Sequence, residues 1–387
     1  MDKVRIGIIG IGNMGSGHAG NIVAGKCPEL ELAAVCDIDP ARLQWAERSL
    51  PATVARFDDA EHMMASGLID AVIIAVPHYD HPRLAIAAFR HHLHVMCEKP
   101  AGVYTRQVRE MNEASRTAGV TFGMMFNQRT NCVYRRTREI VASGEMGAIR
   151  RTNWIITNWY RPQAYYDSGA WRATWSGEGG GVLLNQCPHQ LDLFQWICGL
   201  PVRVDAHMKM GRWHDIEVED DVTAYLEYEN GASGVFVTST GDTPGSNRLE
   251  ITLDGGKLVV ENDRLYRWDL DMPEPEYSRT STEPFGSPKA TFTEVGTDGQ
   301  NPQHVGVLNA FAAHILRGEP LVAEGVEGIR GLMLSNAMHL SAFLGRPVEL
   351  PVDEDLYYSE LMKRVATSRR KTHVNAVTAD TSGTYGS

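Results

Sequence analysis

The sequence has no long apolar run, no closely spaced cysteine pair and no excess of basic residues. A membrane-spanning helix needs about 18 consecutive apolar residues, and the best run, residues 68–77, already contains Asp70. The 37 lysines and arginines are outnumbered by 48 aspartates and glutamates, so the formal net charge is −11. Because nucleic acid and membrane surfaces attract basic proteins, we expect neither as a partner.

Thiol chemistry and secretion are also poorly supported. The six cysteines stand apart from one another, without a CxxC pair, which indicates reduced thiols: Cys27, Cys36, Cys97, Cys132, Cys187 and Cys198. The first residues lack the pattern of a signal peptide, because residues 4–10 read as a strand from the start. A histidine-rich stretch at residues 91–94 has no carboxylate or cysteine at ligand spacing beside it. We therefore expect a cytoplasmic protein without a metal site.

What the sequence does contain is an alternation of buried strands and helices over its first 125 residues. Apolar runs without polar alternation, typical of strands buried on both faces, occupy residues 4–9, 32–36, 71–76, 94–97 and 121–125. Helical patterns lie between and after them, at residues 18–24, 40–49, 60–66, 82–91 and 105–117. This order predicts βαβ units and a doubly wound parallel sheet, the α/β Rossmann architecture.

The second half has the pattern of a different sheet. Strands are predicted at residues 151–159, 205–210, 222–228, 234–239, 248–254 and 257–261. Several alternate with a period of two, and turns at residues 229–231 and 254–256 join successive strands. These features predict an α+β domain with an open, mostly antiparallel sheet, whose outer face is available for a second copy of the chain.

The remaining segments complete the predicted organisation. Residues 272–301 read as a surface loop, and helices at residues 303–316 and 326–343 are expected to close the second domain, with Gly318 and Gly345 as C-caps. The last fifteen or so residues are small and polar, and we expect them to be disordered. The predicted domains are residues 1–126, residues 127–350 and a C-terminal extension at residues 351–387.

A GxGxxG motif follows the first predicted strand and opens a helix, from Gly10 to Gly15. In this context the glycines permit a tight turn and bring the backbone close to a pyrophosphate, which binds at the helix N-terminus. Asp37 ends the second predicted strand, where a carboxylate binds the adenine ribose hydroxyls and repels a 2′-phosphate. NAD is therefore favoured over NADP, although Arg42 lies close enough to leave NADP open.

Further residues are expected around the cofactor at the carboxyl edge of the sheet. His78 and His81 follow the third strand of the prediction, where they either border the nicotinamide or cap a helix. The complete predicted cofactor set comprises Gly10, Gly12, Asn13, Met14, Gly15, Asp37, Pro77, His78, Glu98 and Lys99.

Three motifs stand in order along the chain: the GxGxxG, the tripeptide Glu98-Lys99-Pro100, and a Gly-Gly-Gly segment followed by His189 and Asp192. In this order and spacing the chain resembles the glucose-fructose oxidoreductase/inositol dehydrogenase/rhizopine catabolism (Gfo/Idh/MocA) family over about residues 3–350. The resemblance implies a Rossmann domain with a nicotinamide cofactor, an open α/β domain, and oxidation or reduction of sugars or inositols. It also implies a cis bond before Pro100 and a homodimer or homotetramer.

The resemblance also assigns the catalytic roles. Lys99 would stabilise the developing alkoxide and shuttle its proton, and His189 matches the general acid/base of the family. Asn185 stands where many members carry an aspartate; since an amide cannot accept a proton, it is expected only to orient a hydroxyl. The spacing of Asn185, His189 and Asp192 predicts that they share one helix face, with Asp192 orienting the helix or His189.

Aromatic residues are unusually dense between residues 154 and 175, where four of the eight tryptophans occur with interleaved arginines. Sugar rings stack on aromatic faces, although core packing or a subunit interface explains such clusters equally often. A polar segment at residues 127–129 follows the last strand of the first domain. The predicted substrate contacts are Asn127, Arg129, Trp159, Arg161, Trp171, Arg172, Asn185 and His189.

Three functions fit these residues. The leading one is an NAD-dependent oxidoreductase that transfers a hydride between a secondary hydroxyl of a sugar, glycoside or inositol and nicotinamide. The alternative is an NAD-dependent glycoside hydrolase that works by transient C3 oxidation, elimination, hydration and re-reduction. A non-enzymatic sensor of NAD and sugar is the third, and it is disfavoured because both Lys99 and His189 are present.

Overall fold

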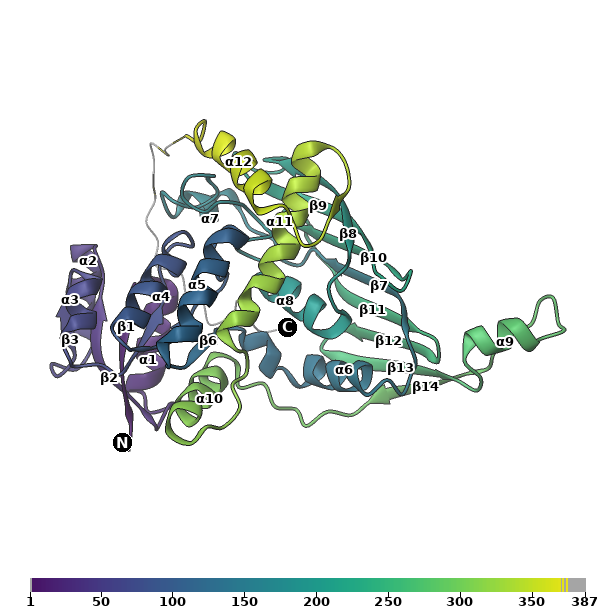
Figure 1. Cartoon of the computed structure of the whole chain (residues 1–387), viewed down its shortest axis with the longest axis horizontal. Coiled ribbons are helices and arrows are strands. Elements are labelled where there is room, and N and C mark those ends of the chain that lie inside the picture. The colour runs from purple at the N-terminus through teal and green to yellow at the C-terminus, as the bar shows by residue number, and fades with distance from the viewer. Residues whose placement is uncertain (1, 370, 372–373, 375–387) are drawn as a thin grey trace.

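The computed structural model describes residues 2–369, 371 and 374, and it contains two sheets with helices packed against them (Figure 1). The predicted disorder of the last fifteen or so residues concerns a stretch that, apart from residue 374, lies outside the described residues. No helix in the described part of the chain is long and apolar enough to cross a membrane.

The first sheet has six parallel strands in the order β3-β2-β1-β4-β5-β6, which confirms the predicted Rossmann arrangement. Its strands are β1 (Val4–Ile9), β2 (Leu30–Cys36), β3 (Ala55–Phe57), β4 (Ala71–Ile74), β5 (His94–Cys97) and β6 (Phe122–Met124). All four residues of β4 are buried, as expected of a central strand covered on both faces. The short strand β3 was not predicted, because its three residues carry no continuous apolar run.

Helices cover both faces of this sheet. They are α1 (Asn13–Val23), α2 (Pro40–Ser49), α3 (Ala60–Ala65), α4 (Asp80–Arg90) and α5 (Thr105–Ala118). Local sequence explains the start of α2, because Asp39 accepts a hydrogen bond from the backbone of Ala41 and Pro40 occupies the first turn. Alternate β1 residues enter different cores: Ile8 packs with the helices on one face and Ile9 with those on the other.

One helix from the C-terminal half also covers the first sheet. Helix α10 (Gln303–Arg317) buries Leu308 and Phe311 in the same core as Val4 and Ile6 of β1. The prediction that this helix closes the second domain was therefore wrong. Its apolar face is the same in either position, so only the tertiary structure identifies which sheet it covers.

The second sheet has nine strands in the order β14-β13-β12-β11-β7-β10-β9-β8-β15, all antiparallel except the pair β7–β10. They are β7 (Ile149–Ile156), β8 (Arg203–Met210), β9 (Glu219–Glu227), β10 (Ser233–Ser239), β11 (Asn247–Leu253), β12 (Gly256–Glu261), β13 (Arg264–Leu270), β14 (Ala290–Val295) and β15 (Val348–Glu349). In β9, Val222, Ala224 and Leu226 are buried. Tyr225 lies 47% exposed on the other face, as the period-two pattern predicts.

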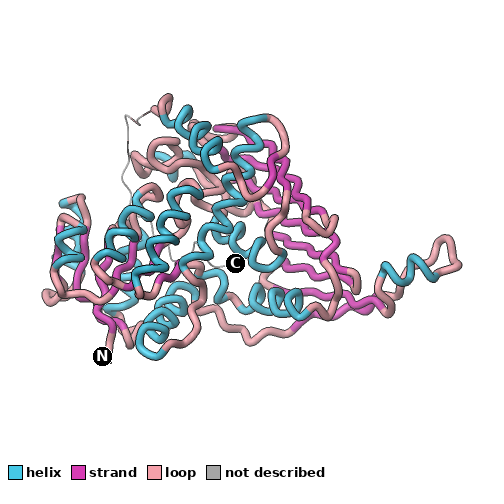
Figure 2. The backbone as a smooth tube through the Cα atoms, in the orientation of Figure 1, coloured by secondary structure: helices cyan, strands magenta, loops and turns pink. Residues whose placement is uncertain are grey.

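The remaining helices gather mainly on the buried face of this sheet and beside the first domain (Figure 2). They are η1 (Asn127–Thr130), α6 (Cys132–Ser143), α7 (Gln163–Asp167), α8 (Pro188–Cys198), α9 (Glu274–Thr280), η2 (Gly325–Glu327), α11 (Gly328–Leu344) and α12 (Glu354–Val365). Phe194 of α8 packs against Trp154 and Phe236 of the sheet. Gly318 and Gly345 end α10 and α11 in the left-handed conformation, which confirms both predicted C-caps.

The predicted surface loop at residues 272–301 is instead partly structured. It contains α9 and the edge strand β14, and with β13 it forms an arm that projects beyond the rest of the chain (Figure 1). Five of the six β14 residues are exposed. Since a strand that buries almost nothing has no apolar alternation, the sequence pattern missed it.

Candidate active site

A cavity of about 440 Å³ lies at the carboxyl ends of the first sheet's strands and extends to the segment before α8. This edge is where open α/β sheets bind their ligands. Its lining includes most of the predicted cofactor residues together with three predicted substrate contacts: Gly10, Gly12, Asn13, Met14, Asp37, Pro77, His78, Glu98, Lys99, Trp171, Arg172 and Asn185. Two segments far apart in the sequence therefore meet at one cavity.

The glycine turn has the geometry that a dinucleotide requires. Gly10 has φ +85°, and a Cβ there would lie 2.5 Å from the carbonyl oxygen of Ala75. A Cβ at Gly15 would lie 1.8 Å from the carbonyl oxygen of Gly10, so α1 packs too closely for a side chain. Gly12 caps α1 without a side-chain hydrogen bond, and a Cβ there would meet nothing within 4 Å. The open helix N-terminus fits a pyrophosphate.

Asp37 connects this turn to the end of β2. Its carboxylate accepts hydrogen bonds from the backbone N–H of Ile11, at 2.8 Å, and of Asp39, at 2.9 Å. Ile38 and Arg42 line the same part of the cavity. The carboxylate is therefore fixed at the cavity wall, where the oxygen lone pairs that the backbone leaves unused can accept from ribose hydroxyls.

Glu98 and Lys99 end β5, and the Lys99–Pro100 peptide bond is cis, as the resemblance implied. Glu98 is buried and lies 2.7 Å from Nε2 of His18 on α1. Burial alone would raise the pKa of Glu98, but the hydrogen bond and charge of His18 outweigh it and lower the pKa to about 2. Glu98 is therefore a permanent anion that joins β5 to the glycine-turn helix.

Lys99 extends from this strand into the cavity, and its Nζ donates to the backbone carbonyl of Asn185 at 3.1 Å. Burial lowers its pKa, while the neighbouring charge of Glu98 opposes the shift. His189, on the first turn of α8, is buried, and burial and the charge of Lys99 lower its pKa well below the usual value. His189 is not among the cavity-lining residues, but it is close enough for the charge of Lys99 to lower its pKa. A neutral imidazole and a lysine of lowered pKa are suited to proton transfer.

The predicted common face of Asn185, His189 and Asp192 was wrong, because α8 begins only at Pro188. Asn185 lies in the preceding turns, which places it at the cavity rather than on the helix. Asp192 does not orient His189 through a hydrogen bond either. Both of its oxygens accept from the guanidinium of Arg129, at 2.7 Å each.

Five of the eight predicted substrate contacts are not among the cavity-lining residues: Asn127, Arg129, Trp159, Arg161 and His189. Arg129 and Asn127 are both buried. Beyond its pair with Asp192, Arg129 donates to Glu327 at 2.9 Å, and Asn127 donates to Gln303 of α10. These contacts tie η1 to α8, η2 and α10, so the structure gives Arg129 a structural partner in place of a substrate.

His78 and its neighbours close the cavity beside the first domain. Nδ1 of His78 lies 3.3 Å from the carbonyl oxygen of Glu178, and its ring is 5.6 Å from that of Trp171. The two ring nitrogens of His81 contact the carbonyls of Val76 and Pro100, at 2.8 Å and 2.7 Å. Both histidines line the cavity, and His81 also links the ends of β4 and β5.

The aromatic segment separates into a core part and a cavity part. Trp154 and Trp175 are buried in the core, whereas Trp171 lines the cavity. Trp159 and Arg161 lie outside the lining and stack on each other, with the guanidinium carbon 5.5 Å from the ring centroid. Of the predicted aromatic contacts, only Trp171 therefore reaches the cavity wall.

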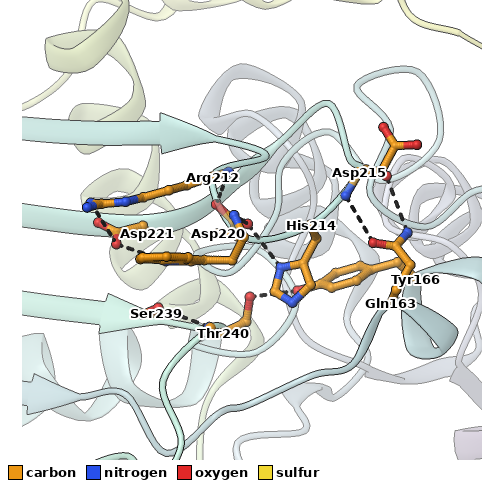
Figure 3. Close-up of polar contacts among 11 residues, drawn as sticks. Gln163, Tyr166, Arg212, His214, Asp215, Asp220, Asp221, Ser239 and Thr240 are labelled. Atoms are coloured by element: carbon orange, nitrogen blue, oxygen red, sulfur yellow. Dashed lines mark hydrogen bonds and ion pairs between the residues drawn. The ribbon is translucent and has the colours of Figure 1, made fainter.

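A cluster of polar side chains fixes α7 against the second sheet (Figure 3). The hydroxyl of Tyr166 donates to Oγ1 of Thr240 at 2.7 Å, and its ring packs 4.8 Å from that of His214. Nδ1 of His214 lies 3.0 Å from the buried carboxylate of Asp220. Because Tyr165 directly precedes Tyr166 on α7, this cluster also fixes the backbone of Tyr165, whose hydroxyl contacts Asn185 at the cavity.

Two functional candidates escaped the sequence analysis. Glu178 is buried behind the cavity and contacts the side chain of Asn185, and the hydroxyl of Tyr165 donates to the other end of the same amide at 3.1 Å. Burial raises the pKa of Glu178 to about 6. The one signal for Glu178 in the sequence is its position directly before the Gly-Gly-Gly segment.

The fold and cavity define a dinucleotide-binding oxidoreductase. Residues 4–126 match the family model described as "Oxidoreductase family, NAD-binding Rossmann fold", and residues 134–259 match the "GFO/IDH/MocA C-terminal domain". The chain belongs to the Gfo/Idh/MocA family, and its first domain is an NAD-binding Rossmann domain.

Similar proteins include several named dehydrogenases. The chain is 30% identical to a D-glucoside 3-dehydrogenase of Escherichia coli, over 90% of this chain and 97% of the relative. It is 24% identical to a myo-inositol 2-dehydrogenase of Thermotoga maritima, over 90% and 98%. The solved structure of the WlbA dehydrogenase from Bordetella pertussis, in complex with NADH and UDP-GlcNAcA, is 27% identical, with a TM-score of 0.77 over 91% of this chain and 99% of that one.

Proposed function

We propose that the protein is an NAD-dependent dehydrogenase that oxidises a secondary hydroxyl of a sugar, glycoside or inositol, or catalyses the reverse reduction. The observation that carries this proposal is the position of the Lys99 amino group. It lies in the cavity beside the glycine turn and donates to the backbone carbonyl of Asn185, which lines the same cavity together with Trp171. The names of the dehydrogenase relatives support the substrate class.

Oxidation of a secondary alcohol removes a proton from oxygen and a hydride from carbon. Lys99, whose pKa is lowered by burial, accepts the hydroxyl proton as a neutral amine, and the ammonium so formed stabilises the developing alkoxide. The proton then passes from Lys99 to the neutral imidazole of His189. NAD bound in the cavity supplies the hydride acceptor. Asn185 orients the reacting hydroxyl or its neighbour through hydrogen bonds, because an amide cannot take the proton itself.

Trp171 and Arg172 are the proposed substrate contacts of the second domain. An aromatic face stacks on the C–H face of a sugar ring, and a guanidinium donates to hydroxyl or anionic oxygens. Both residues line the cavity opposite the first domain. Arg161 and Arg172 both lie near the ring of Tyr165, with their guanidinium carbons 5.2 Å and 4.6 Å from its centroid.

We further propose that the enzyme prefers NAD to NADP. The carboxylate of Asp37 is fixed by two backbone N–H groups at the end of β2, where a 2′-phosphate would meet its negative charge. Arg42, on the first turn of α2, is a cavity-lining cation close to Asp37 and Ile38 in the sequence. Asp37 is bonded directly to the glycine turn, so its charge sets the preference.

The test is to incubate the pure protein with NAD and a panel of neutral and anionic glycosides, sugars and inositols. We expect a product two hydrogens lighter than the substrate, with one NADH formed for each product molecule. Release of the aglycone with an unoxidised sugar, no net NADH and an absolute need for NAD would instead establish the redox glycosidase. Binding of NAD and sugar without any turnover would support the sensor and contradict an enzyme.

Two further proposals concern assembly and compartment. We propose a homodimer or homotetramer formed through the outer face of the second sheet, where Ile155 is 43% and Tyr225 47% exposed. Light scattering should give two or four times the chain mass of 42.8 kDa, and Tyr225→Glu should reduce it. All six cysteines are free and five are buried, which is consistent with a reducing compartment such as the cytoplasm.

A further inference from the structure

Glu178 is a buried carboxylate beside the cavity that none of the proposed steps uses. One of its oxygens accepts from the backbone N–H of Ala173 at 2.5 Å, and the other accepts from the side-chain amide of Asn185. Its backbone carbonyl faces His78. A buried carboxylate is stabilised only where donors converge on it, so these two contacts define what Glu178 does.

The same amide begins a chain of hydrogen bonds that leads to an arginine. Oδ1 of Asn185 accepts from the hydroxyl of Tyr165 at 3.1 Å, and the Tyr165 oxygen accepts from Nη1 of Arg172 at 2.9 Å. Nε2 of Gln186 donates to the same tyrosine oxygen at 3.2 Å. Because Arg172 and Gln186 both donate to the Tyr165 oxygen, the Tyr165 hydroxyl donates its own proton to Asn185.

The two ends of this chain fix its direction. A guanidinium has only donors and an ionised carboxylate has only acceptors. Each intermediate group must then donate away from Arg172 and toward Glu178. An asparagine amide can in principle be placed in two orientations, but here only one satisfies both neighbours, with the nitrogen toward Glu178 and the oxygen toward Tyr165.

The orientation matters because Asn185 lines the cavity and receives Lys99 on its backbone carbonyl, at 3.1 Å. Its Oδ1 uses one lone pair for Tyr165 and keeps the second. A hydroxyl near Lys99 therefore meets an acceptor at this position. If the amide were reversed, the same hydroxyl would meet an N–H donor.

We propose that Glu178 is a positioning residue for hydride transfer: by holding the amide of Asn185 in one orientation, it makes this side chain an acceptor for a substrate hydroxyl beside Lys99. The inference rests on the proposed dehydrogenase function and adds to it a specificity rule. The site selects substrates with a hydroxyl that donates to Asn185, so an analogue with hydrogen, fluorine or a methoxy group at that carbon is rejected.

Exchanging the two functional groups tests this assignment. In Glu178→Gln, the new side chain must present its oxygen to the N–H of Ala173, so its nitrogen faces Asn185 and reverses the amide. In Asn185→Asp, two carboxylates touch and repel. In the double variant E178Q/N185D, the introduced amide donates to the introduced carboxylate, which in turn accepts from Tyr165, so the contacts and the acceptor at position 185 are restored.

The experiment measures kcat and KM of the three variants with NAD and the best substrate of the glycoside panel. We expect each single variant to lower kcat/KM by about tenfold or more and the double variant to regain most of that loss. Glu217→Gln is the matched control, because Glu217 accepts from the backbone of Trp175 and from Ser368 and does not contact Asn185. It should retain wild-type kinetics, and NAD affinity should be unchanged in all four.

Wild-type kinetics in Glu178→Gln, or a double variant as impaired as the product of the two single losses, would overturn the inference. If the single variants do not fold, Tyr165→Phe breaks the same chain at its middle and should lower kcat/KM in the same way; unchanged kinetics in that variant would equally overturn it.

Thermal unfolding of the same variants separates this inference from the proposed function. Rescue of the melting temperature in the double variant, with a wild type that oxidises no substrate, would support the amide contact and refute the dehydrogenase. Turnover by the wild type without rescue in either kcat/KM or melting temperature would leave the dehydrogenase standing and refute the role of Glu178.

Discussion

Replacing Lys99 by alanine should disable turnover while leaving NAD binding largely intact. The amine is anchored at 3.1 Å from the carbonyl of Asn185 and lies in the cavity, so its removal deletes both a positioned charge and a proton acceptor. Loss of one preorganised donor at a developing oxyanion lowers turnover by about 10²–10³-fold, and loss of a positioned acid or base by about 10²–10⁴-fold. Because the two roles belong to one group, the losses do not multiply.

We therefore expect kcat of Lys99→Ala to fall by about 10³-fold, which corresponds to about 4 kcal/mol of transition-state stabilisation. The glycine turn and Asp37 would hold NAD through more contacts than a single lysine supplies, so the Kd for NAD should change by no more than about threefold. Absorbance of NADH gives the rate, and quenching of tryptophan fluorescence by the cofactor gives the affinity. Lys363→Ala, at an exposed lysine of α12 that pairs with Glu360, is the matched control and should behave as wild type.

Two results would refute this reasoning. A Lys99→Ala variant with turnover within about threefold of wild type would show that another group stabilises the alkoxide. A variant that loses NAD affinity in proportion to its activity would show that Lys99 holds the cofactor and not the reacting hydroxyl.

Three further predictions concern the cofactor, the core and acid stability. Asp37→Ser should lower the preference for NAD over NADP by about tenfold, because it removes the charge that meets a 2′-phosphate; kcat/KM with each cofactor measures this. Arg129→Met should lower the unfolding free energy by about 3–5 kcal/mol in urea titrations, because it leaves Asp192 buried without its cation. Glu98→Gln should be less stable than wild type above pH 4.5, and this difference should shrink as the pH falls. Since the pKa of Glu98 is lowered from 4.5 to about 2, its ionised carboxylate stabilises the wild type fully above pH 4.5, and this contribution disappears as the pH falls through about 2. The free energy of unfolding of the wild type should change by about 3 kcal/mol relative to the variant.

Matched variants serve as controls for these predictions. Arg317→Met breaks an exposed pair with Glu29 and should cost no more than about 1 kcal/mol, so a similar cost at Arg129 would contradict the buried-pair argument. Glu61→Gln removes an exposed carboxylate beside His91 and should show little pH dependence. A constant difference between wild type and Glu98→Gln from pH 6 to pH 2 would contradict the depressed pKa, and unchanged cofactor preference in Asp37→Ser would remove Asp37 from cofactor selection.

Much of the first domain could be predicted from the sequence because its signals are local. Strands β1 and β5 and helix α2 were predicted to the residue, since a strand buried on both faces is continuously apolar and α2 carries its own cap at Asp39. The glycine turn was found for the same reason, because Gly10 and Gly15 of its short motif pack against each other. Lys99 also lies in a short motif, and the structure places it in the cavity, although its side chain contacts a carbonyl 86 residues away.

The rest depended on contacts between segments that are distant in the sequence. Arg129 and Asp192 are 63 residues apart, and their pairing gives an arginine in a polar segment a structural role that composition does not reveal. Helix α10 has an apolar face that could pack against either sheet, so its pattern alone does not identify which one it covers. Asn185 was placed on α8 because its spacing from His189 fits a helix, whereas the turns continue up to Pro188.

Glu178 illustrates the same limit at the site itself. Its neighbours Ala173 and Asn185 are five and seven residues away, yet the turns between them determine whether the carboxylate meets an amide or solvent. A glutamate before a glycine run has many possible environments, and only the folded turns select one.

The most direct test of the central account uses a substrate deuterated at the carbinol carbon, incubated with stoichiometric enzyme and NAD and analysed by mass spectrometry. The account predicts that the deuterium moves to the nicotinamide in wild type, with one ketone formed per NADH, and that Lys99→Ala transfers it about 10³-fold more slowly. Product formed with the deuterium retained on the carbinol carbon throughout, and no label on the nicotinamide, would contradict it.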